Sequence, residues 1–141
     1  MPCSEITKLH LLESFCLPLL CYACEAVSLI PEKAAAIAMQ VCWNNAYRKF
    51  FKYNVWESVK MLQNMCERLD FYHIFALRKF NFWYSAKTSM NKITNVYLSV
   101  CKTSLEFLDL CYTYDVCVNY SSISSIKHNV NSHFRTVCLN H

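Results

Sequence analysis

Apolar residues recur at helical spacing in the first part of the chain. The clearest case is the set Met39, Trp43, Ala46, Tyr47 and Phe50, at positions i, i+4, i+7, i+8 and i+11. Residues at this spacing share one face of an α-helix. Pro31 and Glu32 stand just before them, and both residue types are favourable in the first turn of a helix. The pattern predicts a helix from there to about Lys52, with its apolar face turned inward.

Other segments show weaker forms of the same pattern. Residues 6–29 indicate a helix that Pro18 kinks or ends early, because proline lacks a backbone donor. Residues 58–66 and 70–87 indicate two more helices, the second with Asp70 as N-cap, and residues 90–110 are weakly helical. The 70–87 helix carries aromatic residues around most of its circumference, so we expect it to be buried on several sides. Beyond Tyr112 the chain becomes rich in Ser, which favours a loosely structured tail.

These segments define the expected fold. We predict an all-α protein, an irregular bundle of four to five helices in a domain over residues 1–112, with a poorly ordered polar tail at 113–141. The chain contains no Gly and three Pro. Tight hairpin turns depend on glycine, so its absence favours helices joined by short polar connections. Gly-rich loops that hold nucleotide phosphates are excluded as well, and no cofactor is expected.

Composition sets the compartment that we expect. Hydrophobic residues make up 55% of the 141 residues and charged residues 17%, which is ample material for a core. The N-terminal residues carry mixed charge and lack a signal-peptide layout, so the ten cysteines are expected to be reduced in an intracellular protein of the cytoplasm or nucleus. The longest uncharged apolar run, residues 14–24, is shorter than the roughly 17 residues that span a bilayer, so no membrane contact is expected.

Basic residues concentrate in the middle of the chain. Residues 1–32 have a net charge of −3, residues 33–92 have +7, and residues 93–141 are neutral. An anion-binding surface is therefore expected in the middle segment. Asn45, Arg48, Lys49 and Lys52 fall at i, i+3, i+4 and i+7, opposite the apolar stripe of the predicted 31–52 helix. They form a row of hydrogen-bond donors, although a solvated helix face explains the same residues.

Three phrases resemble one known family. They are Phe15-Cys-Leu-Pro-Leu-Leu-Cys-Tyr-Ala-Cys-Glu, Trp43-Asn-Asn-Ala-Tyr-Arg-Lys-Phe-Phe and Trp56-Glu-Ser-Val-Lys-Met-Leu-Gln. In this order and spacing they resemble the segment that follows the catalytic palm in non-LTR (LINE-type) retrotransposon reverse transcriptases, over about residues 8–85. Ala23 stands where that family often has glycine, and the Cys66-Glu-Arg-Leu-Asp segment stands where it usually has a Gly-containing turn ending in Leu-Pro. Both departures imply altered turns or a decayed copy.

The resemblance implies a thumb-like role without catalysis. The palm of that family holds two metal ions on paired aspartates, whereas this chain has no adjacent acids and the Tyr112-Thr-Tyr-Asp115 phrase has only one. We therefore expect no enzyme, and at most sequence-nonspecific binding of an RNA or DNA primer-template through phosphates. The expected contacts are Asn45, Arg48, Lys49 and Lys52, extended by Arg78, Lys79 and Lys87. The alternatives are a helical interaction or structural module that self-associates through apolar faces, or a chance open reading frame without activity.

Other residues with chemical potential have simpler explanations. Cys21 and Cys24 have the spacing of half a zinc site, but no second pair accompanies them, so two small core residues are expected. His128, His133, Cys138 and His141 match no zinc spacing, and chance is the favoured reading. Aromatic residues at helical spacing are expected in the core rather than stacked on bases. These residues are Trp43, Tyr47, Phe50, Phe71, Phe75, Phe82 and Trp83. Trp56, in an expected connection, is the aromatic to test for exposure.

Overall fold

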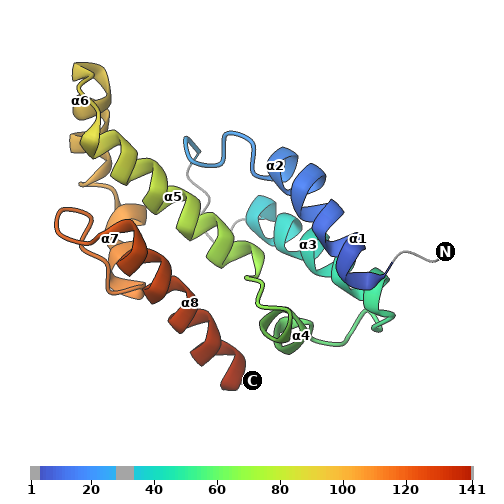
Figure 1. Ribbon diagram of the computed structural model, residues 1–141. Coiled ribbons are helices and arrows are strands. Elements are labelled where there is room, and N and C mark those ends of the chain that lie inside the picture. Colours follow the sequence, from blue (N-terminus) through green and yellow to red (C-terminus); the bar gives the residue numbers. More distant parts are fainter. Residues whose placement is uncertain (1–3, 28–33, 141) are drawn as a thin grey trace. The chain divides into compact units, whose positions relative to one another are not determined.

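The computed structural model describes residues 4–27 and 34–140, which are helices and short connections without a strand (Figure 1). The predicted all-α class is confirmed. The chain divides into two compact units, Met1–Tyr72 and His73–His141. This division differs from the expected boundary after residue 112. Within the described residues, no helix has both the length and the apolar character that crossing a membrane requires.

The first unit opens with a helix that changes its pitch. α1 (Glu5–Leu11) is followed by a π-helical segment, η1 (Leu12–Cys16), and by the short α2 (Leu17–Leu20). The Leu17 N–H donates to the carbonyl of Leu12, five residues back. Pro18 supplies no N–H and its ring would crowd the carbonyl four residues back in a regular helix, so the wider turn accommodates it. The helix ends at Leu20, earlier than the predicted residue 29.

α3 (Ala34–Phe51) carries the stripe that the sequence predicted. Trp43 and Tyr47 are fully buried, and the Trp43 indole donates to the Leu69 carbonyl at 3.3 Å. The predicted start at Pro31 and Glu32 lies outside the described residues. α1 packs against α3, and α4 (Lys60–Met65) falls inside the predicted 58–66 segment.

Among the described residues of this glycine-free chain, four adopt left-handed backbone: Ala23, Lys52, Glu67 and Asp115 have φ of 56°, 58°, 55° and 50°. After three of them, the next residue donates its N–H to a carbonyl five residues back, which is the Schellman arrangement at a helix end. The bonds run from Tyr53 to Arg48 (2.9 Å), from Arg68 to Gln63 (2.8 Å) and from Val116 to Cys111 (2.9 Å). Glycine is the usual residue there, since a Cβ makes this conformation costly.

The second unit is built on α5 (Phe71–Thr88), whose first two residues belong to the first unit, and on α6 (Lys92–Cys101), α7 (Leu105–Thr113) and α8 (Ile123–Leu139). Phe75, Phe80 and Trp83 of α5 are buried, as its aromatic pattern predicted. The weak helix predicted at 90–110 is two helices, because residues 102–104 form a turn. Asn91 caps α6 by accepting from the Ile93 N–H at 2.9 Å, and Ser104 caps α7 by accepting from the Phe107 N–H at 3.2 Å.

The C-terminal segment is not the loose tail that the sequence suggested. Ser122 accepts a hydrogen bond from the Ser125 N–H at 3.2 Å and starts α8. Ile126, Val130, Phe134 and Cys138 then lie four residues apart and are all buried. The serines that lower the helical propensity of this segment thus provide its N-cap, and the buried stripe makes α8 part of the second unit's core.

Candidate nucleic-acid interface

The expected basic row on α3 is partly used by the protein itself. The Arg48 guanidinium donates from Nε and Nη2 to the Glu57 carbonyl, at 3.1 and 3.0 Å, and from Nη1 to the Asn45 side chain at 2.8 Å. Arg48 therefore ties the loop after α3 to the helix. Asn45, although exposed, serves as an acceptor for Arg48.

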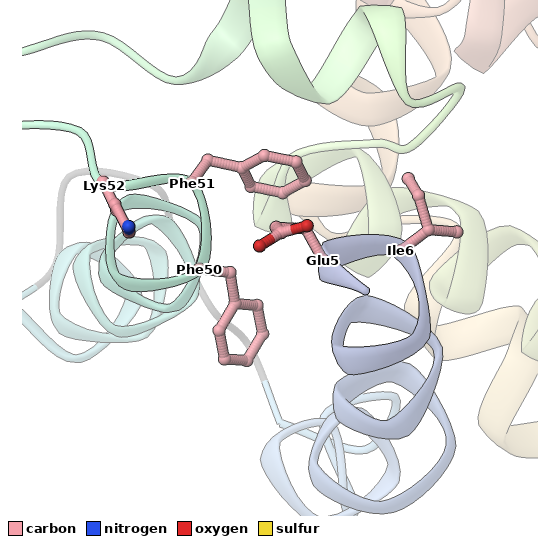
Figure 2. Close-up of a pocket in the computed structure, with 5 residues that line it drawn as sticks. All are labelled: Glu5, Ile6, Phe50, Phe51 and Lys52. Carbon is pink, nitrogen blue, oxygen red and sulfur yellow. The ribbon is translucent and has the colours of Figure 1, made fainter. Parts of the chain in front are cut away.

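Lys49 and Lys52 are the exposed cations of this row. Lys49 lies on the helix, whereas Lys52 lies beyond its end in left-handed backbone. The four residues therefore do not continue as one helical row. Lys52 instead lines an open hollow of about 420 Å³ with Glu5, Ile6, Phe50 and Phe51. In Figure 2 the Glu5 carboxylate and both phenylalanine rings border this hollow. A carboxylate in the lining of this hollow repels phosphate and makes the hollow a poor phosphate site.

Lys79 is not available to a phosphate, which corrects the expectation from the sequence. Its residue is 3% exposed, and its Nζ pairs with the Glu106 carboxylate at 3.2 Å. The ammonium also lies over the rings of Phe75 and Trp83, 5.5 and 5.9 Å from their centroids. Because α5 is covered on most sides, a cation at this position is enclosed and paired.

Lys87 and Lys102 converge on one residue of the second unit. Lys87 Nζ donates to the Asn119 carbonyl at 2.6 Å and to the Val118 carbonyl at 3.4 Å. Lys102 Nζ donates to the Asn119 side-chain oxygen at 3.1 Å. Arg78, the remaining expected contact on α5, is half-buried. Lys102 was missing from the expected set because no sequence spacing connects it to Lys87.

The net charge of the chain is divided unequally between the two structural units. Met1–Tyr72 contains seven Lys and Arg and seven Asp and Glu, so the first unit is neutral. His73–His141 contains seven Lys and Arg against Glu106, Asp109 and Asp115, so the second unit carries the whole +4. The basic stretch at residues 33–92 is cut by the boundary at Tyr72. The positive field of the chain thus belongs to the second unit.

Most of the aromatic residues are core, as the helical spacing predicted. Trp43, Tyr47, Phe71, Phe75 and Trp83 are buried, and Phe50 and Phe82 are half-buried. Trp56 is 83% exposed in the loop after α3. Only Trp56 of this set presents its ring openly to solvent, so the set as a whole is not a stacking platform.

Tyr47 is buried in an unusual polar environment. Its hydroxyl lies out of contact with solvent and has no hydrogen-bond partner among the described residues. Burial, with Glu13 and Cys66 adding to it, raises the pKa of Tyr47 well above its ordinary value. Glu13 pairs with Arg68 at 2.6 Å from Oε1 to Nε. Burial also raises the pKa of the Cys66 thiol, so this cysteine is a poor nucleophile.

The Cys and His residues considered as zinc ligands do not form a metal site in the described residues. Cys21 and Cys24 are buried in the turns that follow α2. On α8, His128 is exposed, Cys138 is buried, and His133 Nδ1 lies 3.0 Å from His73 Nε2, within hydrogen-bond distance. His141 lies outside the described residues. In residues 4–27 and 34–140, no three His, Cys, Asp or Glu side chains group as metal ligands.

Comparisons with known proteins identify no relative: no family model, no curated protein and no solved structure matches the chain.

Proposed function

We propose that this chain is a non-catalytic helical piece of a LINE-type reverse transcriptase that acts as a sequence-nonspecific nucleic-acid-binding module. The observation that carries the proposal is the charge division, because the second unit holds an excess of four positive charges. One of its three acids, Glu106, is already paired with the buried Lys79. Exposed cations with few neighbouring acids attract the phosphate backbone without reading its bases.

Two turns support the family relationship. The family that the sequence resembles often has glycine where Ala23 stands, and usually has a Gly-containing turn at the segment that holds Glu67. Both residues have left-handed backbone, at φ of 56° and 55°. This conformation is the one for which glycine is used. The departures therefore keep the backbone geometry of glycine, as expected if the side chains changed after the fold was established.

The binding test is a salt titration with labelled RNA and DNA oligonucleotides, followed by fluorescence anisotropy. Nonspecific binding of this kind has a Kd of about 10⁻⁴ to 10⁻⁶ M at physiological salt, and its logarithm changes linearly with the logarithm of salt concentration. We expect a clear slope and no preference between scrambled sequences. Affinity that stays the same across salt concentrations contradicts the proposal.

A second candidate is a helical interaction module, favoured by exposed apolar stripes on two helices. Ile93, Val96 and Val100 of α6 are exposed at i, i+3 and i+7, and Leu105, Leu108 and Tyr112 of α7 repeat the same spacing. Contiguous exposed apolar surface is typical of association sites. Sedimentation equilibrium tests this function. A monomer at all concentrations rejects self-association, while dimers that Val96→Asp dissociates support it.

A further inference from the structure

We propose that Lys87, Lys102 and Tyr120 form a contact site for single-stranded nucleic acid, organised by Asn119 in the connection between α7 and α8. This inference rests on the proposed function and specifies its site. Lys87 comes from the end of α5 and Lys102 from the turn after α6, yet both ammonium groups bind oxygens of Asn119, at 2.6 and 3.1 Å. Segments distant in sequence thus bring two cations to one place.

The two ammonium groups keep donors for a ligand. An ammonium has three N–H donors. Lys87 uses two of them on the carbonyls of Val118 and Asn119, and Lys102 uses one on the Asn119 side chain. Lys87 Nζ also lies over the Tyr84 ring, 5.9 Å from its centroid. Two N–H groups of Lys102 and one of Lys87 are thus without a hydrogen-bond acceptor among the described residues and can bind phosphate oxygens. These hydrogen bonds also limit the rotation of both lysine side chains before binding, so less rotamer entropy is lost when a phosphate binds.

No acid in the described part of the second unit neutralises this pair. Of the three acids there, Glu106 is paired with Lys79. Neither Lys87 nor Lys102 forms an ion pair with Asp109 or Asp115. The two positive charges therefore bind the same residue, Asn119, without an acid among the unit's described residues to neutralise them. Their mutual repulsion in the free protein decreases when a phosphate binds.

Tyr120 supplies the preference for single strands. Its side chain is 90% exposed, directly after Asn119 in the chain. The turn that presents it is held by the N–H groups of Tyr120 and Ser121, which donate to the Cys117 carbonyl at 3.0 and 2.7 Å. An exposed ring one residue from the Asn119 that both lysines bind suits a base that stacks while its phosphates are neutralised. The faces of duplex bases are covered by their neighbours, so the ring favours an unpaired strand.

The test compares charge-matched double variants on a labelled oligothymidylate and on the corresponding duplex. K87Q/K102Q removes the proposed cations, and K92Q/K127Q removes the same charge from other exposed lysines of the second unit. We expect K87Q/K102Q to weaken single-strand binding about tenfold at low salt and to reduce the salt slope by about 1.4 units, because each phosphate contact on a single strand contributes about 0.7, with little effect from K92Q/K127Q. K87R/K102R should retain most of the affinity. Melting temperatures check that each variant is folded.

Y120A provides an independent readout, because an exposed side chain can be removed without affecting the core. We expect single-strand affinity to fall between about 5-fold and 100-fold, and duplex affinity to stay unchanged. Equal losses from the two lysine double variants, with wild-type binding intact, would overturn this site while the proposed function survives. No binding by the wild-type chain would reject both. If Y120A loses duplex affinity and single-strand affinity to the same extent, bases do not stack on Tyr120 and the single-strand part of the proposal is wrong.

Discussion

The buried hydroxyl of Tyr47 predicts that Tyr47→Phe stabilises the protein. Tyr47 is fully buried on α3, and its oxygen has no hydrogen-bond partner among the described residues. The ring contacts are independent of that oxygen: an edge contact with Trp43 at 5.6 Å between centroids and stacking with Phe51 at 6.4 Å. Phenylalanine keeps both contacts and removes the unsatisfied group.

The size of the effect follows from the desolvation of one hydroxyl. Leaving a buried polar group unsatisfied costs about 1 to 3 kcal/mol, and the small space that the oxygen vacates offsets part of the gain. We expect a net stabilisation of about 1 kcal/mol. For a chain of this size that corresponds to an increase in Tm of about 3 °C.

The stability difference should also depend on alkaline pH. Tyrosine in the unfolded chain titrates near pH 10. Burial raises the pKa of Tyr47 in the folded state, so above about pH 10 the unfolded state loses this proton first and the folded state loses stability. The contribution is constant below that pH and falls by about 1.4 kcal/mol per pH unit above it, until the folded pKa is reached. Phenylalanine has no such proton, so its advantage should grow above pH 10.

Urea denaturation of both proteins at pH 7 and near pH 11 measures these differences. Tyr112→Phe is the matched control, because Tyr112 is 90% exposed and should change little at either pH. A Tyr47→Phe protein that is less stable than wild type by 1 kcal/mol or more at pH 7 would refute the reasoning, since the hydroxyl would then have a stabilising partner.

Three further predictions concern other sites. Glu67→Gly should raise the free energy of unfolding by about 1 kcal/mol in urea denaturation, because Glu67 has left-handed backbone; a decrease would contradict this. Glu106→Gln should lower it by about 3 kcal/mol, since Lys79 is left charged and buried, and unchanged stability would argue against the ion pair. Burial raises the pKa of Cys111 to about 11, so mass-spectrometric mapping should find it alkylated more slowly by iodoacetamide at pH 8 than the exposed Cys16.

The pattern of apolar residues along the chain was sufficient to predict that aromatic side chains of α3 and α5 are buried. The burial of Trp43 and Tyr47 followed from helical spacing alone, and so did that of the α5 aromatics. α8 could have been found as well. Its buried residues repeat every four positions from Ile126 to Cys138, but the low helical propensity of the serines obscures this stripe, and the serine that caps the helix is also typical of a loop.

The candidate site required tertiary structure. Lys79 was expected to be exposed because charge is usually solvated, but an aromatic helix that is covered on most sides encloses it with Glu106. Lys87 and Lys102 are both basic in the sequence, yet only the position of Asn119 brings their ammonium groups together. Helical periodicity does not encode which oxygens a long side chain reaches across the fold.

The left-handed backbone positions have a consequence for how this sequence can change. Codons for alanine, glutamate and aspartate each lie a single base from a glycine codon, so Ala23, Glu67 and Asp115 are all one point mutation away from a relaxed backbone. Random mutation of the gene followed by selection on heat resistance should therefore return to these three positions repeatedly. Glycines recovered there would identify the positions at which a single substitution most readily stabilises the fold.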